Sequence, residues 1–172
     1  ADLGFLEPTP YNFPHAIATD HSFRKINSAD WTSGFYPGIM WYLYDHSEKE
    51  ELKSAAETWM SFIEREQYNT HTHDLGFMVY NSFGNAMEIT GNKDYAPIIV
   101  QTAQSLASRY NDTVGCIRSW DFAEHVWSFP VIIDNMMNLE LLFEAHKLSG
   151  NQKLYDIAVK HAETTMEHHF RE

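Results

Sequence analysis

The sequence repeats one arrangement three times: a short polar or glycine-containing segment, a mostly apolar helix, a tight break and an amphipathic helix. These copies begin near Trp31, Asp74 and Asp134. The break Thr90-Gly91-Asn92-Lys93 aligns with Ser149-Gly150-Asn151-Gln152 at an offset of 59 residues. Glycine just past a helix end is the usual left-handed cap. The repeat therefore predicts stacked helical hairpins.

Apolar periodicity predicts where the helices of each pair lie. We expect them at residues 37–46 and 49–66, 75–90 and 92–110, and 135–149 and 151–169. In the last helix the predicted inward stripe consists of Tyr155, Ala158, Ala162 and Met166. Residues 1–30 carry three prolines and no sustained period, so they are predicted to be an extended arm.

Within each pair the first helix is apolar on nearly every side, whereas the second is apolar on one side only. A helix that is apolar all round has to be buried all round. An inner ring of apolar helices wrapped by an outer ring of amphipathic helices satisfies both requirements. We therefore predict an all-α fold of the α/α-toroid type.

The length and net charge of the chain limit the classes of protein to which it can belong. A chain of 172 residues suits one domain with a real core. The net charge of −12, without a Lys/Arg cluster, argues against nucleic acid and anionic membranes as partners. No apolar run reaches the length of a membrane span. The single cysteine, Cys116, excludes an internal disulfide.

Asp74 and Asp134 occupy the same position in two copies of the repeat, each at the entrance to an apolar helix. The inner helices of a toroid run parallel, so both carboxylates are expected at one mouth. The segment 31–38 takes the same position in the first copy and should face the same cavity. Helix capping is the alternative for both aspartates, because Asp is common at helix starts.

The protonation states of these two acids are expected to differ. A helix N-terminus stabilises a charged carboxylate, whereas a general acid has to keep its proton. Burial beside Ile132, Ile133 and Met136 would favour the protonated form of Asp134. We expect one acid to stay ionised while the other is held protonated.

Other chemistries find less support in the sequence. His71-Thr72-His73-Asp74 offers three potential metal ligands, but no Cys or second carboxylate cluster completes a site. The histidines, His161 included, are expected to be exposed or to contact substrate, and no metal or cofactor is expected. Cys116 has no identifiable His/Asn partners, and no Gly-x-Ser-x-Gly elbow is present.

Five ordered motifs are spread across residues 31–170: Trp31-Thr32-Ser33-Gly34-Phe35-Tyr36-Pro37-Gly38, His73-Asp74-Leu75-Gly76-Phe77-Met78, Arg118-Ser119-Trp120, Ile133-Asp134-Asn135-Met136-Met137-Asn138-Leu139 and Ser149-Gly150-Asn151. Together they resemble the unsaturated glucuronyl hydrolases of glycoside hydrolase family 88. The resemblance implies an (α/α)6 barrel of six hairpins. It also implies removal of 4,5-unsaturated glucuronic acid from the non-reducing end of lyase-generated glycosaminoglycan oligosaccharides, by hydration of the C4=C5 double bond.

The resemblance assigns roles to individual residues. Asp134 corresponds to the acid/base and Asp74 to a second essential acid. The expected substrate contacts are Trp31, His73, Asn135 and Trp120, with Trp31 as a sugar platform. The implied partner is an unsaturated oligosaccharide, and the implied setting is the periplasm or cytoplasm of a bacterium.

This sequence shows three hairpins where the family's barrel has six. We therefore expect residues 1–172 to be a single partial catalytic domain, with an arm at 1–30 and three hairpins at 31–172. The missing half-barrel or another copy of the chain is the expected partner. Alone, the chain is expected to self-associate, because half a toroid exposes apolar inner helices.

Three alternatives remain open at the level of sequence. Unsaturated rhamnogalacturonyl hydrolases of family 105 share the fold and the reaction. An inactive helical module that binds sugar or a partner protein belongs to a different class. A metal-dependent hydrolase is the third.

Overall fold

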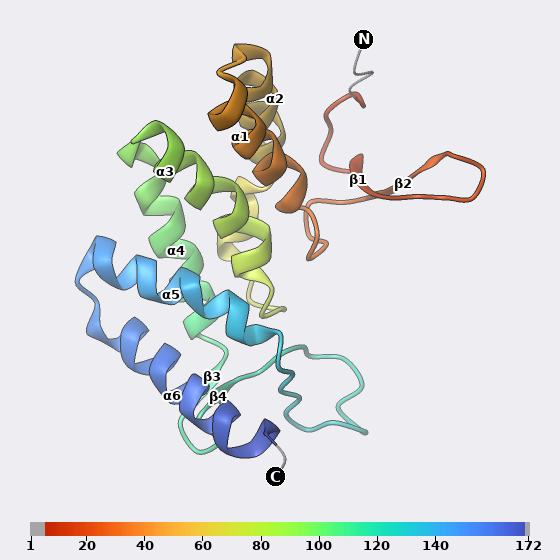
Figure 1. The fold of residues 1–172 in the computed structure, drawn as a ribbon. Coiled ribbons are helices and arrows are strands. Elements are labelled where there is room, and N and C mark those ends of the chain that lie inside the picture. The colour runs from red at the N-terminus through yellow and green to blue at the C-terminus, as the bar shows by residue number, and fades with distance from the viewer. Residues whose placement is uncertain (1–5, 171–172) are drawn as a thin grey trace. The chain divides into compact units, whose positions relative to one another are not determined.

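A computed structural model describes residues 6–170, which are mainly helical (Figure 1). Residues 1–5 of the predicted arm lie outside the described part. The helices follow in the predicted order along the chain: α1 (Phe35–Ser47), α2 (Glu50–Ser61), α3 (Asn85–Thr90), α4 (Ala96–Ala107), α5 (Asn135–Ser149) and α6 (Gln152–His169). Of the predicted pairs, α1 packs against α2 and α5 packs against α6. None of the helices within residues 6–170 has the length and apolarity needed to cross a bilayer.

The chain divides into two compact units. The first comprises Ala1–Glu66 and Phe77–Tyr95, and the second comprises Gln67–Gly76 and Ala96–Glu172. The two 3-10 helices, η1 (Glu64–Tyr68) and η3 (Lys93–Tyr95), and the π-helical segment η2 (Gly76–Gly84) lie at or near the boundaries between these ranges. That all 172 residues belong to a single domain stays a prediction.

In the first unit α1 packs against α2 and α3. The inward side of α2 carries Leu52, Ala56 and Trp59, at the helical spacing that the sequence predicted. The Trp59 side chain is 1% exposed, and its ring packs edge-on against Phe13 and Tyr36 with centroid distances of 4.9 and 5.1 Å. Trp59 is thus the centre to which the N-terminal segment is attached.

The arm predicted as simply extended contains a β-hairpin. Strand β1 (Phe13–Ile17) pairs antiparallel with β2 (Phe23–Ile26), with an irregular register between Pro14 and Ala16. The Asp20 carboxylate accepts hydrogen bonds from the Ser22 N–H and hydroxyl at 3.0 and 2.6 Å, which closes the turn. The bulge interrupts the alternation that marks a strand, so periodicity did not show the hairpin.

In the second unit α5 packs against both α4 and α6. The short strands β3 (Tyr110–Asn111) and β4 (Cys116–Ile117) pair antiparallel, and β4 lies against α6. A long connection of residues 118–134 then leads to the start of α5 (Figure 1). Its backbone has no strand of its own except the isolated bridge between Thr72 and Trp120.

The glycine breaks are confirmed as left-handed helix caps. Gly91 ends α3 with φ +70° and Gly150 ends α5 with φ +71°, and their N–H groups donate to the carbonyls of Met87 and His146. The helix predicted at 75–90 is confirmed in its bounds, because residues 75–90 are helical throughout. Its segment Gly76–Gly84 is π-helical (η2), whereas Asn85–Thr90 is α-helical (α3).

The first helices α1 and α5 are partly exposed, as expected for inner helices of half a toroid. In α1 the side chains of Ile39 and Tyr42 are 56% and 62% exposed, and in α5 that of Met137 is 69% exposed. Each helix therefore presents an apolar surface to solvent in addition to its buried side.

The inward stripe predicted for α6 is displaced by about one position. Tyr155 and Met166 are exposed, whereas the buried positions are Leu154, Ile157, Ala158, His161 and Thr165. The predicted inward stripe of α6 was displaced because it was chosen from apolar residues alone. The buried side of α6 includes the polar residues His161 and Thr165, and His161 has polar partners in the interior.

Phe13 provides a test of how the hairpin is anchored. Its side chain is fully buried, so we expect Phe13→Ala to lower the free energy of unfolding by about 3–5 kcal/mol. Phe23→Ala is the matched control, because Phe23 lies on the partner strand and is 51% exposed. Urea unfolding followed by circular dichroism measures both. Equal losses in the two variants would contradict this account of the anchoring.

Candidate active site

His73 lies beside both helix-entry acids within the second unit. Its Nε2 is 3.2 Å from Asp74 Oδ1 and 3.6 Å from Asp134 Oδ1. The His73 side chain is 3% exposed, so this ring meets the two carboxylates from the protein interior. The structure thus brings together Asp74 and Asp134, which are 60 positions apart in the chain.

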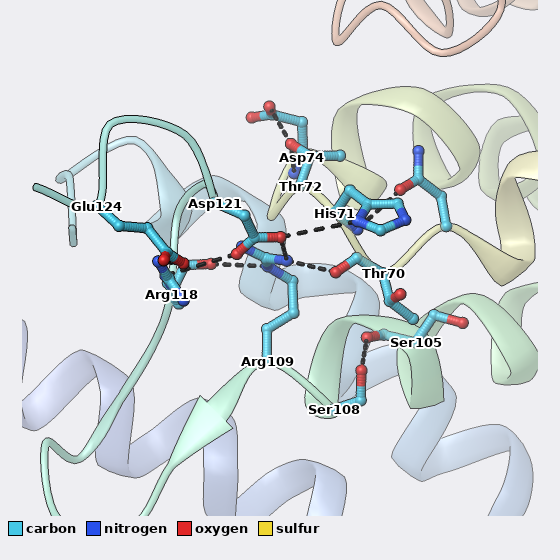
Figure 2. A network of polar contacts seen from close by, with 11 residues as sticks. Thr70, His71, Thr72, Asp74, Ser105, Ser108, Arg109, Arg118, Asp121 and Glu124 are labelled. Carbon is cyan, nitrogen blue, oxygen red and sulfur yellow. Dashed lines mark hydrogen bonds and ion pairs between the residues drawn. The ribbon is translucent and has the colours of Figure 1, made fainter. Parts of the chain in front are cut away.

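Asp74 has its hydrogen-bonding needs met locally. The Thr72 hydroxyl donates to Asp74 Oδ2 at 2.6 Å, and the Asp74 backbone N–H donates to the same hydroxyl oxygen at 3.2 Å (Figure 2). These two bonds close a tight loop just before η2. They fix the direction of the Asp74 side chain, which is 19% exposed.

Asp134 has a different environment. It occupies the N-cap position of α5, yet its side chain makes no capping hydrogen bond, so the capping alternative is wrong for this residue. Its Oδ1 is buried and has no hydrogen-bond partner within residues 6–170, although the side chain as a whole is 44% exposed. One oxygen is therefore enclosed by protein while other atoms of the side chain reach solvent.

Burial raises the pKa of Asp134 above the usual value of an aspartate. The neighbouring charges act in opposite directions: the negative charge of Asp74 raises this pKa further, and positive charge on His73 lowers it. A raised pKa is the direction expected from the sequence. The expected neighbours Ile132, Ile133 and Met136 are themselves 37%, 52% and 36% exposed, and their part in the burial stays a prediction.

Gly76 allows the Asp74 segment to approach α5. A Cβ atom at this position would lie 2.8 Å from the Cα and 2.7 Å from Oδ1 of Asn138. These distances are too short for any side chain, so only glycine permits the contact. The close approach brings the chain two residues after Asp74 against the helix that begins just after Asp134.

His161 is a buried histidine of the protein interior. The expectation that it is exposed or contacts substrate is wrong. Its side chain is fully buried, and Nδ1 accepts a hydrogen bond from the Ile117 N–H at 2.9 Å. Burial lowers the pKa of His161 to about 4, so the ring is neutral at ordinary pH. Its place on α6, four residues after Ile157 and before Thr165, was the available signal.

The tautomer of His161 follows from this contact. A backbone N–H can only donate, so Nδ1 is the acceptor and the neutral ring carries its proton on Nε2. The Asn135 side-chain amide lies 3.2 Å from Nε2. An Nε2–H donor is satisfied when the amide turns its oxygen toward the ring, because the two ends of an amide exchange by rotation. His161 thereby orients the residue next to Asp134.

Of the remaining predicted substrate contacts, Asn135 and Trp120 belong to the second unit and Trp31 to the first. Asn135 is fully buried beside His161. Trp120 stacks on Phe122 with a centroid distance of 5.2 Å. Trp31 belongs to the first unit, where its ring is 50% exposed and lies edge-on to Phe77 at 5.8 Å. Trp31 therefore has the exposed aromatic surface that a sugar platform requires.

A cation could meet three donors in the cluster. One ligand atom each from His73, Asp74 and Asp134 lies within 4.8 Å of the others. This set differs from the His-x-His-Asp set suggested by the sequence. His71 is 87% exposed, and its Nδ1 lies 3.8 Å from the Asp121 carboxylate (Figure 2).

Sequence reasoning missed a buried arginine that supports the site. Arg109 is 8% exposed, and its guanidinium binds both carboxylate oxygens of Asp121 at 3.0 Å (Figure 2). Its Nε donates to the Arg118 carbonyl at 2.8 Å, and Nη1 donates to the carbonyl of Thr70. No local pattern marks these pairs, because the partners come from separate segments.

Comparison with known proteins gives consistent matches. The profile of Glycosyl Hydrolase Family 88 matches residues 10–172. An unsaturated glucuronyl hydrolase of Formosa agariphila is 48% identical over 162 residues, which are 93% of this chain and 40% of that protein. An unsaturated chondroitin disaccharide hydrolase of Streptococcus pneumoniae is 31% identical, with coverage of 87% and 39%.

A solved structure of an unsaturated glucuronyl hydrolase specific for heparin superposes with a TM-score of 0.89 at 44% identity. The match covers 95% of this chain and 44% of that one. The chain thus spans about two fifths of the length of the relatives it matches. These structures are (α/α)6 barrels, which confirms the predicted fold class, and this chain corresponds to part of one.

The two charged neighbours of Asp134 should shift its pKa in opposite directions when each is removed. Asp74→Asn removes a negative neighbour, so we expect the pKa of Asp134 to fall. His73→Gln removes a source of positive charge, so we expect it to rise. Carbon-detected NMR titration of the Asp134 carboxyl measures both, with Asp156→Asn on the exposed side of α6 as the control. Shifts in the same direction would refute this electrostatic account.

His161 predicts a dependence of stability on pH. Its folded pKa of about 4 lies below the unfolded value of 6.5, so the unfolded chain binds more protons between these values. Stability should therefore fall by about 2–3 kcal/mol as the pH drops from 6.5 to 4. We expect His161→Gln to remove this component in unfolding curves measured across that range. His125→Gln, at an exposed site, should retain it.

Proposed function

Because the chain belongs to glycoside hydrolase family 88, we propose that the intact protein removes 4,5-unsaturated glucuronic acid from lyase-generated glycosaminoglycan oligosaccharides. The reaction is hydration of the C4=C5 double bond at the non-reducing end. The observation that carries this proposal is the Asp134 carboxyl, whose pKa is raised and whose Oδ1 lies 3.6 Å from His73 Nε2. A carboxyl that keeps its proton beside a second carboxylate suits acid catalysis.

In the proposed reaction Asp134 acts as both acid and base. Its carboxyl gives a proton to C4, and the resulting carboxylate accepts a proton from the water that adds to C5. The carboxyl is then protonated again, and the product is a hemiketal at C5. Rearrangement of this hemiketal breaks the glycosidic bond. Because water does not attack the anomeric carbon, the carboxylate spacing rule of ordinary glycosidases does not apply.

Other residues take supporting roles in this proposal. Asp74, held by the Thr72 hydroxyl, binds substrate hydroxyls. His73 contacts the substrate. Trp31 provides an exposed indole face for the sugar, and Trp120 is a second contact. Asn135 is fully buried and is oriented by His161, so its proposed role is to hold the start of α5 next to Asp134 and not to touch the sugar.

The names of the relatives guide the choice of substrate. The solved structure at 44% identity is of an enzyme specific for heparin, and the relative at 31% identity is an unsaturated chondroitin disaccharide hydrolase. We therefore infer that unsaturated disaccharides of glycosaminoglycans, heparin-derived ones first, are the substrates. These matches favour this class over pectin-derived rhamnogalacturonyl substrates.

Loss of the ultraviolet absorbance of the conjugated double bond tests the proposal. The intact protein should consume unsaturated disaccharides from heparin, chondroitin or hyaluronan. Asp134→Asn removes the proton donor, and we expect turnover to fall by about 10²–10⁴-fold. Asp112→Asn, at an exposed site next to β3, is the carboxylate control and should keep full activity.

Two outcomes would count against this function. Unchanged absorbance across the whole glycosaminoglycan panel would contradict it. Faster turnover of a pectin-derived unsaturated disaccharide would assign the protein to the rhamnogalacturonyl class.

A further inference from the structure

Ser119 links the two segments that carry the acids. Its side chain is 1% exposed. Its carbonyl accepts a hydrogen bond from the His73 N–H at 3.1 Å, and its N–H donates to the Pro130 carbonyl at 2.8 Å. Its hydroxyl oxygen accepts from the Ile132 N–H at 3.1 Å. The carbonyl therefore holds the Asp74 segment, while the other two groups hold the Asp134 segment.

The hydroxyl bond acts on the turn from which Asp134 projects. Ile132 lies two residues before Asp134, and its carbonyl accepts from the Asn135 N–H at 3.3 Å. The Ile132 peptide is thus bound on one side to Ser119 and on the other to the start of α5. Any residue other than proline at position 119 supplies the two backbone bonds, but the third bond requires a side-chain acceptor.

Ser119 itself is held firmly on both flanks. Before it, the Arg118 carbonyl accepts from Arg109 Nε at 2.8 Å (Figure 2). After it, Trp120 forms the isolated bridge with Thr72, and Asp121 is bound by the Arg109 guanidinium. The segment 118–121 is therefore a fixed support to which both acid-bearing segments are attached.

We propose that Ser119 is a positioning residue whose hydroxyl sets the distance of Asp134 from His73 and Asp74. The recorded separation of 3.6 Å between His73 Nε2 and Asp134 Oδ1 lies just outside hydrogen-bonding range. A shift of the turn therefore either closes this contact or opens it to solvent. The effect on turnover rests on the proposed function, whereas the effect on the separation does not.

Ser82 is a matched control for loss of a buried hydroxyl. It is fully buried in the first unit, and its hydroxyl donates to the carbonyls of Met78 and Val79, both at 3.0 Å. Ser82→Ala removes a hydroxyl of comparable burial without touching either acid-bearing segment. A general loss of stability would appear in both variants, and a loss of positioning only at Ser119.

The experiment compares Ser119→Ala, Ser119→Thr and Ser82→Ala in the intact protein. Crystal structures of Ser119→Ala should show the His73 Nε2 to Asp134 Oδ1 separation changed by roughly 0.5–1 Å, and a displacement of that size lowers kcat by about tenfold to a hundredfold. KM should stay within about twofold, because the substrate contacts are untouched. Ser119→Thr keeps the hydroxyl and should restore kcat, and Ser82→Ala should leave both quantities unchanged.

If Ser119→Ala does not fold, Ser119→Cys replaces it, because its weaker acceptor should give an intermediate change in the same direction. An unchanged separation in a folded Ser119 variant overturns the proposal, as does an equal loss of kcat in Ser82→Ala. If wild-type protein turns over no unsaturated disaccharide, the proposed function fails. The crystallographic separation then still decides the role of Ser119.

Discussion

The paired charges of Arg109 and Asp121 are the interaction on which the site depends. A guanidinium with a side chain only 4% exposed has to find partners for its donors, since an unpaired buried charge is very costly. Arg109 finds them in one carboxylate and in the carbonyls of Thr70 and Arg118. Those carbonyls belong to the loop before Asp74 and to the segment that carries Ser119. Because burial of the Arg109 guanidinium is costly without these partners, it holds the segments around Thr70 and Arg118 close together.

On this support, two identical side chains acquire different properties. Asp74 receives a hydroxyl donor from two residues earlier in the chain, whereas Asp134 Oδ1 is enclosed without a hydrogen-bond partner among the described residues. Burial raises the pKa of Asp134, and the nearby Asp74 charge adds to the effect. The surroundings of the two side chains thus differ in the way that the proposed role of Asp134 as the acid requires.

Local patterns predicted what depends on local physics. The glycine caps at Gly91 and Gly150 and the helix that starts at Asn135 follow from rules that act over a few residues. The hydrogen bonds of His161 and Ser119 join segments far apart in the chain, so periodicity could not show them. The hairpin at Phe13–Ile17 was missed because one buried aromatic, not an alternating pattern, anchors it.

Charge favours a protonated form of the proposed acid. The proposed substrates carry a carboxylate, and a chain with net charge −12 repels an anion at long range. Two ionised aspartates at the site would add a local repulsion to that field. Burial raises the pKa of Asp134 and so disfavours its charged form, which reduces this repulsion. The same burial therefore supports both the proposed role of Asp134 as proton donor and the proposed anionic substrate.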